Sequence, residues 1–537
     1  MKKKVIALLM VLLFTTSLVS GCFSSSSSQA DGNYIRHNHG QEPETIDPAL
    51  NTTVNGGTVI LATFEGLTSL DENDSPIPGV AEDWVISEDQ KTYTFHLRKD
   101  AKWSDGEPVT AKDFKYAWIR ALDPATAAEY AYQLFYIENA EEFNAAKAKA
   151  EDVAINVIDD YTLEVTLKSP TPFFLNLTAF PTLAPVRQDI IEAHGEKWTK
   201  NPETYIGNGP FKMVEWVSKD MMKFEKNEHY WDKDRVKIDG FIETFIAEDS
   251  TMLAAYEAGE LDVIDSVPLD EIANLKQSPD FVMTPQVGTY YYCFNVQKAP
   301  FDDVRVRKAF ALALDKEDIV NKIRKSGIPA GAFVAPGLPD AKEGEDFREV
   351  GGDFFPLKAQ PEEARKLLAE AGYPNGEGFP EVTLIYNTDE GHKKIAEAAL
   401  EMWKQNLGID NIKLSNQEWA VFVNTRQTGD FQIARHGWIG DYTHPMTFID
   451  LFTTGNGNND AQWSNKEFDE LVAQARLVDN EEERMEILHR CEELFMNDVI
   501  MIPIFYYTEN AMVKPYVKGL VKSALGFTYF DRAYIEE

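Results

Sequence analysis

The sequence predicts an α/β protein of several domains, and three observations lead to this prediction. The chain has 537 residues, more than one ordinary hydrophobic core holds, so its length favours two to four domains. Segments with the two-residue periodicity of strands alternate with segments of helical periodicity. Residues 381–414 have the order strand, helix, strand, which predicts a βαβ unit with parallel strands.

The amino-terminal residues have the pattern of an export signal. Three lysines precede an apolar run at 5–14, which is shorter than the roughly 20 residues of a membrane span. Small residues and Cys22 follow, an arrangement that resembles the bacterial lipobox. The resemblance implies that residues 1–21 are a signal peptide and that Cys22 is lipidated. The serine-rich residues 22–31 then predict a flexible tether between the lipid and an exported, folded body.

The composition is that of an acidic globular protein. Hydrophobic residues make up 44% of the chain and the formal charge is −36, which would become −39 once residues 1–21 and their three lysines are removed. Such a surface repels nucleic acid and anionic lipid headgroups, so we predict no nucleic-acid partner. Of the cysteines, Cys293 and Cys491 are almost 200 residues apart, and we predict free buried thiols, with a disulfide as the alternative.

The first half of the chain contains two clear strand patterns around a helix. Residues 92–98 and 161–167 alternate apolar and polar side chains, as half-buried strands do. Between them, residues 110–122 place apolar side chains at helical spacing, and Thr110 is suited to the N-cap.

The second half predicts an alternation of helices with parallel strands. The predicted βαβ unit consists of a strand at 381–387, a helix at 392–407 and a strand at 412–414. A further helix is expected at 361–371, with proline in its first turn, and one long helix at 302–325.

No motif for catalysis or for metal binding is present. The chain contains no G-x-S-x-G, no H-E-x-x-H, no P-loop and no strand-borne G-x-G-x-x-G. His37 and His39 alternate along a short strand pattern, so we predict solvated strand residues on one face, with a metal pair as the alternative. His436 and His444 are separated by a loop whose spacing aligns them in neither helix nor strand, and we interpret His444 as a loop residue. We therefore predict no metal, no cofactor and no enzymatic activity.

Several ordered stretches resemble the solute-binding lipoproteins of bacterial peptide ABC importers. They are FEGL (64–67), TFHLRKDAKWSDGEPVTAKDF (94–114), GNGPF (207–211), GELD (259–262), YYYCFNVQKAPFDDVRVRKAF (290–310), YNTDEGHKKIA (386–396), NQEWAVFVNTRQTGDFQIARHGWIGDY (416–442) and PIFYYTENAMVKPY (503–516). Because they cover nearly the whole exported chain in the family order, the match is specific.

The resemblance implies the large, three-domain form of the periplasmic-binding-protein-like type II fold, with a hinged cleft. The first lobe is expected at 32–65, 190–292 and 508–537, the second domain at 66–189 and the third domain at 293–507. In the family, an extended peptide lies between the first lobe and the third domain, and closure of the hinge buries it.

The resemblance also assigns ligand-binding residues. Asp441, in a G-W-x-x-D-Y motif, is expected to hold the α-ammonium of the ligand, because an ionised carboxylate in a closed cleft forms a strong charge-assisted bond. The backbone of Gly437, Trp438 and Ile439 is expected to offer a strand edge. Other positions match family residues around the ligand: Trp419 and Trp438 as pocket walls, Arg426 and Arg435 toward carboxylates, His392 near the end of longer peptides, and the cleft tyrosines Tyr130 and Tyr507.

A few positions depart from the family pattern. They are Thr52, which lies two residues before Val54, Cys293, the pair Asp265 and Ser266, and His444. These positions adjoin the later residues of a ligand, so Val54, Asp265 and Ser266 are also expected to contact it, and peptide length and C-terminal recognition stay open. The predicted function is capture of oligopeptides and delivery to the permease of an ABC transporter, by a monomer anchored on the extracytoplasmic side of the cell membrane. The alternatives are another solute (a dipeptide, metal chelate, haem or sugar) on the same fold, and a secreted hydrolase.

Overall fold

The computed structural model describes residues 32–536. The predicted signal peptide, Cys22 and tether therefore lie outside the described residues. Among the helices that are described, none combines the length and the hydropathy needed to cross a membrane.

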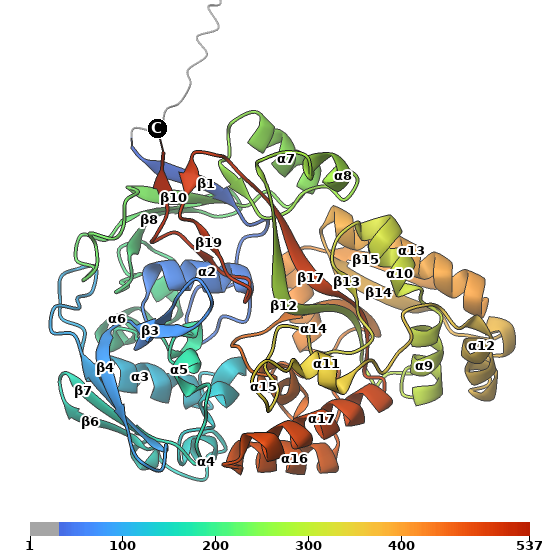
Figure 1. The fold of residues 1–537 in the computed structure, drawn as a ribbon, viewed down its shortest axis with the longest axis horizontal. Helices are drawn as coiled ribbons and strands as arrows, with labels where there is room; N and C mark the ends of the chain where they lie inside the picture. The colour runs from blue at the N-terminus through green and yellow to red at the C-terminus, as the bar shows by residue number, and fades with distance from the viewer. Residues whose placement is uncertain (1–31, 537) are drawn as a thin grey trace, which may run out of the picture.

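One large mixed sheet extends through two of the three parts of the molecule (Figure 1). Its strand order is β15-β14-β16-β12-β17-β11-β1-β10-β9-β8, with β13 also paired to β17. The antiparallel strands β12 (Phe281–Phe294) and β17 (Met501–Val513) lie in its middle. The two long strands therefore cross from one part to the other, as a hinge between two lobes requires.

On one side of these strands lies the part that we call the first lobe, around β1, β8–β11 and the end of the chain. Its elements are β1 (Tyr34–Asn38), α2 (Val54–Thr63), α6 (Gln188–His194), η4 (Gly195–Thr199), β8 (Phe211–Val217), β9 (Met221–Lys226), β10 (Gly240–Thr244), α7 (Asp249–Glu257), β11 (Val263–Ile264), α8 (Ile272–Leu275), β18 (Val517–Lys518), β19 (Val521–Lys522), β20 (Thr528–Tyr529) and β21 (Tyr534–Ile535). β1 and β8–β11, from two distant regions of the sequence, thus share the large sheet, while β18 pairs with β21 and β19 with β20 in two small sheets.

The second domain has a sheet of its own, in the order β4-β5-β7-β6. Its elements are β2 (Thr68–Leu70), β3 (Pro76–Pro78), β4 (Ala81–Ile86), β5 (Thr92–Leu97), α3 (Ala111–Leu122), η1 (Glu129–Leu134), α4 (Ala140–Asn144), η2 (Ala150–Asp152), β6 (Ile155–Asp159), β7 (Thr162–Thr166), α5 (Phe174–Leu177) and η3 (Pro181–Leu183). Both strands and the helix predicted here are confirmed. Thr110 is the N-cap of α3, and its backbone N–H donates to Asp113 at 2.7 Å, the pattern of a capping box.

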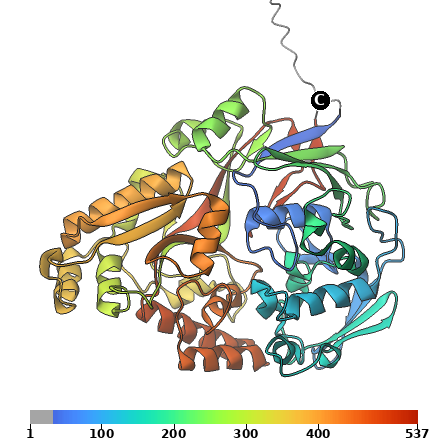
Figure 2. The same cartoon turned by 180° about the vertical axis from the view of Figure 1, so that it is seen from behind.

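The third domain contains the predicted parallel unit, β14-α13-β15 (Figures 1 and 2). Its elements are α9 (Val304–Leu312), α10 (Lys316–Asp318), η5 (Ile319–Arg324), β13 (Ile328–Pro329), α11 (Phe347–Gly351), α12 (Pro361–Glu370), η6 (Pro374–Gly376), β14 (Val382–Asn387), α13 (Glu390–Leu407), β15 (Ile412–Gln417), α14 (Trp419–Gln427), β16 (Ile433–Ile439), α15 (Met446–Ile449), η7 (Asp450–Phe452), α16 (Lys466–Leu477) and α17 (Glu481–Asn497). Cys293 and Cys491 are free and buried, as predicted.

The prediction of one long helix at 302–325 is wrong. The chain forms α9, then leaves the helix, and begins α10 at Lys316. Asp315 explains the restart, because its side chain accepts the backbone N–H of Asp318 at 2.8 Å and caps the new helix. The segment then continues as one π-helical stretch to Arg324.

Candidate functional site

A cavity of about 310 Å³ lies between the first lobe, the second domain and the third domain. Its walls come from the loops after β1 and β10, the start of α2, η1, the beginnings of α7 and α13, α14, and β16 with the loop that follows it. Except for Asp265, every residue predicted to contact a ligand lines this one cavity: Val54, Tyr130, Ser266, His392, Trp419, Arg426, Arg435, Gly437, Trp438, Ile439, Asp441 and Tyr507.

Asp441 is a buried carboxylate held only by neutral groups. Its oxygens accept hydrogen bonds from the Tyr130 hydroxyl at 3.0 Å and the Gln133 amide at 2.7 Å, while its own N–H donates to Thr447. Burial raises the pKa of Asp441 well above its ordinary value, although these neutral partners oppose the shift. Its charge is thus uncompensated within the described chain, which is the arrangement expected where a ligand supplies the cation.

Strand β16 presents an open edge to the cavity. Its residues Ile433–Ile439 pair antiparallel with β12 along their whole length. On the opposite side, β14 pairs only with Ile433 and Ala434. Within residues 32–536, the strand therefore has no second strand partner from Arg435 to Ile439. The Gly437 N–H donates to the ring of His436 at 2.8 Å, and the strand edge is otherwise open to an extended ligand.

A side chain at Gly437 would displace Tyr507, whose ring end occupies the space of a β-carbon. A Cβ at this position would lie 2.2 Å from the Tyr507 hydroxyl oxygen. That hydroxyl accepts a hydrogen bond from Arg435 at 2.9 Å. The glycine therefore permits the contact that positions Arg435.

We expect Gly437→Ala to weaken ligand binding at least tenfold, because the methyl group displaces Tyr507 and frees Arg435. The double variant Gly437→Ala/Tyr507→Phe lacks the clashing oxygen and is expected to recover part of the affinity. Binding calorimetry on the two variants and on Tyr507→Phe alone measures the coupling. Equal affinities for wild type and Gly437→Ala would contradict this assignment.

Arg435 and Arg426 differ in what neutralises them. Arg435 donates to the side-chain Oδ1 of Asn387 at 3.3 Å and to the Tyr507 hydroxyl, and no carboxylate of residues 32–536 lies within 4.0 Å of its guanidinium. Arg426 instead lies 3.5 Å from Asp460. Arg435 is therefore the better placed of the two to receive a carboxylate from a ligand.

Aromatic side chains form the walls next to Asp441. The Trp438 and Tyr130 rings lie 6.2 Å apart between centroids, and Tyr130 also packs edge-on against Phe180 at 5.1 Å. The indole N–H groups of Trp438 and Trp419 have no hydrogen-bond partner in the described chain. These rings can hold ligand side chains by apolar contact and can report on binding by fluorescence.

His392, Val54 and Ser266 also line the cavity, whereas His444 does not. His392 is in the first turn of α13, where burial and the charges of Arg435 and Arg324 hold its pKa well below its usual value, so the ring is neutral. Val54 begins α2 and Ser266 follows β11. His444 is indeed a loop residue, but it is buried: it hydrogen-bonds to Glu481 at 2.9 Å and packs on Phe173.

Four acidic residues of the cavity wall are not among those predicted from the sequence. Glu129, Asp249, Asp389 and Asp460 all line it. Asp389 is also the N-cap of α13 and accepts the backbone N–H of His392 at 2.6 Å. A helix-start aspartate in YNTDEGH was the available signal, but such a pattern indicates a cap and does not reveal a cavity.

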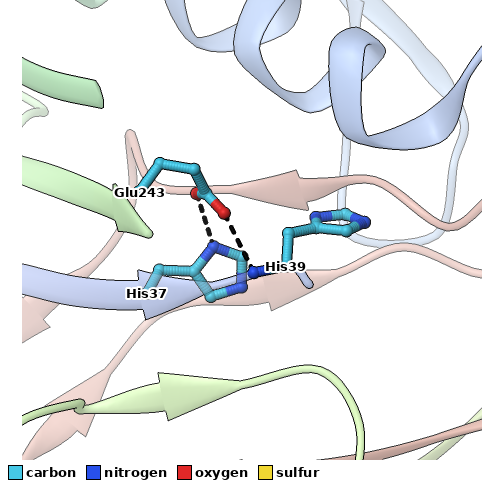
Figure 3. Close-up of side chains that lie close together, drawn as sticks. All are labelled: His37, His39 and Glu243. Carbon is cyan, nitrogen blue, oxygen red and sulfur yellow. Dashed lines mark hydrogen bonds and ion pairs between the residues drawn. The ribbon is translucent and has the colours of Figure 1, made fainter. Parts of the chain in front are cut away.

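Asp265 belongs to a buried ion network, of which Figure 3 shows His37, His39 and Glu243. His37 bonds through its two ring nitrogens to Glu243 at 2.7 Å and to Asp265 at 2.8 Å, and Asp265 also contacts Lys522. His39 lies 3.2 Å from Asp265. The prediction that His37 is solvated is therefore wrong, because carboxylates more than 200 residues away cover it.

The same cluster has the donor types of a metal site, but its hydrogen bonds argue against one. His37, His39 and Glu243 place ligand atoms within 4.8 Å of one another. Burial lowers the pKa of His37, but the charges of Asp265 and Glu243 outweigh it and raise the value to about 9. A protonated imidazole whose nitrogens are both occupied has no lone pair for a metal.

We expect His37→Gln to reduce stability in a pH-dependent way. Because the folded pKa is raised, the stabilisation from His37 is complete below about pH 6.5 and is lost as pH rises through about 9. A shift of this size corresponds to about 3 kcal/mol. The melting temperatures of the wild type and of His37→Gln, measured from about pH 6 to about pH 9.5, should converge at the alkaline end. A difference in melting temperature that stays constant across this range would contradict the prediction.

Comparison with known proteins places the chain in a family. Residues 75–460 match the model of the bacterial extracellular solute-binding proteins, family 5 Middle. The chain belongs to this family. It is also 39% identical, over an alignment 554 residues long, to the oligopeptide-binding protein OppA of Bacillus subtilis, and the alignment covers both chains fully.

Solved structures of family members indicate which conformation is present. The Haemophilus influenzae OppA complex with RPPGFSPFR superposes with a TM-score of 0.89 at 36% identity, covering 94% of this chain and 99% of that chain. An unliganded open form of the murein tripeptide-binding protein MppA reaches 0.61 at 34% identity, covering 94% and 98%. At equal coverage and similar identity, the arrangement of the lobes resembles the complex more closely than the open form.

Proposed function

We propose that this protein captures oligopeptides in the cavity between its lobes and delivers them to the permease of an ABC importer, without chemical change. The observation that carries the proposal is Asp441, a buried carboxylate whose partners are all neutral, at the end of an open strand edge. A peptide supplies both an α-ammonium for the carboxylate and a backbone for the edge.

The distribution of charge along β16 supports a defined orientation. Arg435, with no carboxylate partner within 4.0 Å in the described chain, lies at one end of the open edge, and Asp441 follows its other end. The four strand steps from Arg435 to Ile439 span about 14 Å, since an antiparallel strand rises roughly 3.4 Å per residue. An extended peptide of about three to five residues would reach both charges while running antiparallel to β16.

A direct experiment is native mass spectrometry of the protein purified without denaturation, followed by titration with a peptide library. We expect added masses of short peptides, a change in the fluorescence of Trp419 and Trp438, and peptides recovered intact. Fragments that accumulate with time would favour the hydrolase alternative. Binding of a solute without an amine, but of no peptide, would favour another ligand on the same fold.

Attachment to the membrane is part of the proposal and concerns residues outside the described range. Cleavage before Cys22 and lipidation of its thiol would anchor a monomer on the extracytoplasmic side through the tether at 22–31. Cys22→Ser should release the protein from the membrane fraction. Retention of that variant on membranes would contradict lipid anchoring.

A further inference from the structure

The cavity wall has more carboxyl groups than positively charged groups. Five carboxyl groups line it, against two guanidinium groups, those of Arg426 and Arg435. The acids are Glu129, Asp249, Asp389, Asp441 and Asp460. The three lining histidines add no positive charge, because burial lowers the pKa of His39, His392 and His436. A peptide without charged side chains carries one charge of each sign, so it leaves this excess unchanged.

Asp249 is a second buried acid of the cavity wall that has no positively charged partner in the described chain. Asp249 is 2% exposed, and no Lys, Arg or His side chain of residues 32–536 lies within 4.0 Å of its carboxylate. The Ser266 hydroxyl is a neutral neighbour, while Asp389, Glu390 and Glu248 add negative charge around it. Burial, followed by the charge of Asp389, raises the pKa of Asp249 to about 8.

The two acids Asp249 and Asp389 come from opposite lobes. Asp249 is at the start of α7 in the first lobe, and Asp389 caps α13 in the third domain (Figure 1). The adjacent residues join the lobes directly, because the Ser250 hydroxyl donates to Glu390 at 2.6 Å. Closure therefore brings two like charges together at the cavity wall, which is unfavourable unless a cation or a proton lies between them.

We propose that Asp249, faced by Asp389, forms a subsite for the ammonium or guanidinium group of a lysine or arginine side chain in the bound peptide. The inference rests on the proposed function, since it names a subsite within the same cavity. Met252 lies one turn after Asp249 on α7 and also lines the cavity. Its apolar side chain can cover the methylene groups of such a ligand residue, while the carboxylates hold the charged end.

The test compares pentaalanine with pentaalanine carrying one lysine at position 2, 3, 4 or 5, by calorimetry. Nε-acetyl-lysine at the same positions is the matched control, because it keeps the stem and removes the charge. We expect one position at which lysine binds at least tenfold more tightly than acetyl-lysine. Asp249→Asn should abolish that preference. Its affinity for pentaalanine should be no weaker than that of the wild type, because the variant removes the like charge that faces Asp389 in the closed form.

A second control separates contact from general electrostatics. Glu248→Gln removes a charge from the adjacent residue, which is exposed and outside the cavity lining, and should keep the lysine preference. If pentaalanine binds but lysine and acetyl-lysine are equal at every position, the subsite does not exist and the proposed function stands. If no peptide of the series binds, both proposals fail. The comparison of lysine peptides with acetyl-lysine peptides on the wild-type protein tests the subsite even if Asp249→Asn does not fold.

Discussion

Asp441→Asn is expected to weaken peptide binding by a factor on the order of 30 to 4,000. The variant keeps the size of the side chain and can keep bonds with Tyr130 and Gln133, but it cannot pair with an ammonium group. Loss of one member of a buried charge pair costs roughly 2–5 kcal/mol, which gives this range. Calorimetric titration of both proteins with a peptide that binds the wild type measures the effect.

The unliganded variant should be at least as stable as the wild type. The folded pKa of Asp441 is raised, so its ionised carboxylate destabilises the closed fold at pH values above the unfolded pKa of about 4, and asparagine removes this cost. Peptide should then raise the melting temperature of the wild type only. A variant that loses binding because it is misfolded would show a lowered melting temperature and would not support the assignment.

Arg435→Met is expected to remove the discrimination between peptides with a free C-terminus and their amides. Arg435 lacks a carboxylate partner in the described chain, and a bond to a charged group contributes about 1.5–3 kcal/mol, or roughly 10- to 150-fold in affinity. For alanine peptides of two to six residues, we expect amidation to weaken wild-type binding most at the length whose C-terminus reaches Arg435.

The conservative variant Arg435→Lys supplies the control for this prediction. Lysine retains the charge but cannot donate two bonds in a fixed fork, so it should restore part of the discrimination. If amidation weakens binding to wild type and Arg435→Met equally at every length, Arg435 does not receive the ligand carboxylate.

The sequence predicted most of the cavity because its residues lie within continuous motifs. Gly437, Trp438, Ile439 and Asp441 are close neighbours in the chain, so one motif indicates both the strand edge and the carboxylate beside it. The local elements were predictable for the same reason. Thr110 and Asp113, three residues apart, determine where α3 begins.

What the sequence could not predict depends on contacts between distant segments. His37 is buried because Glu243 and Asp265 cover it, and no local pattern locates those partners. The same contacts occupy Asp265 and keep it from the cavity. Asp249 has the pattern of an ordinary acidic residue in the first turn of a helix. Only the closed arrangement of the lobes shows that it faces Asp389.

The central claim is that a ligand ammonium group compensates the buried charge of Asp441. Calorimetric titration of the wild type with a short peptide and with its Nα-acetyl derivative tests it most directly. We expect the free peptide to bind and the acetylated peptide, which lacks the ammonium group, to bind at least 30-fold more weakly. Equal affinity for the two peptides would contradict the account.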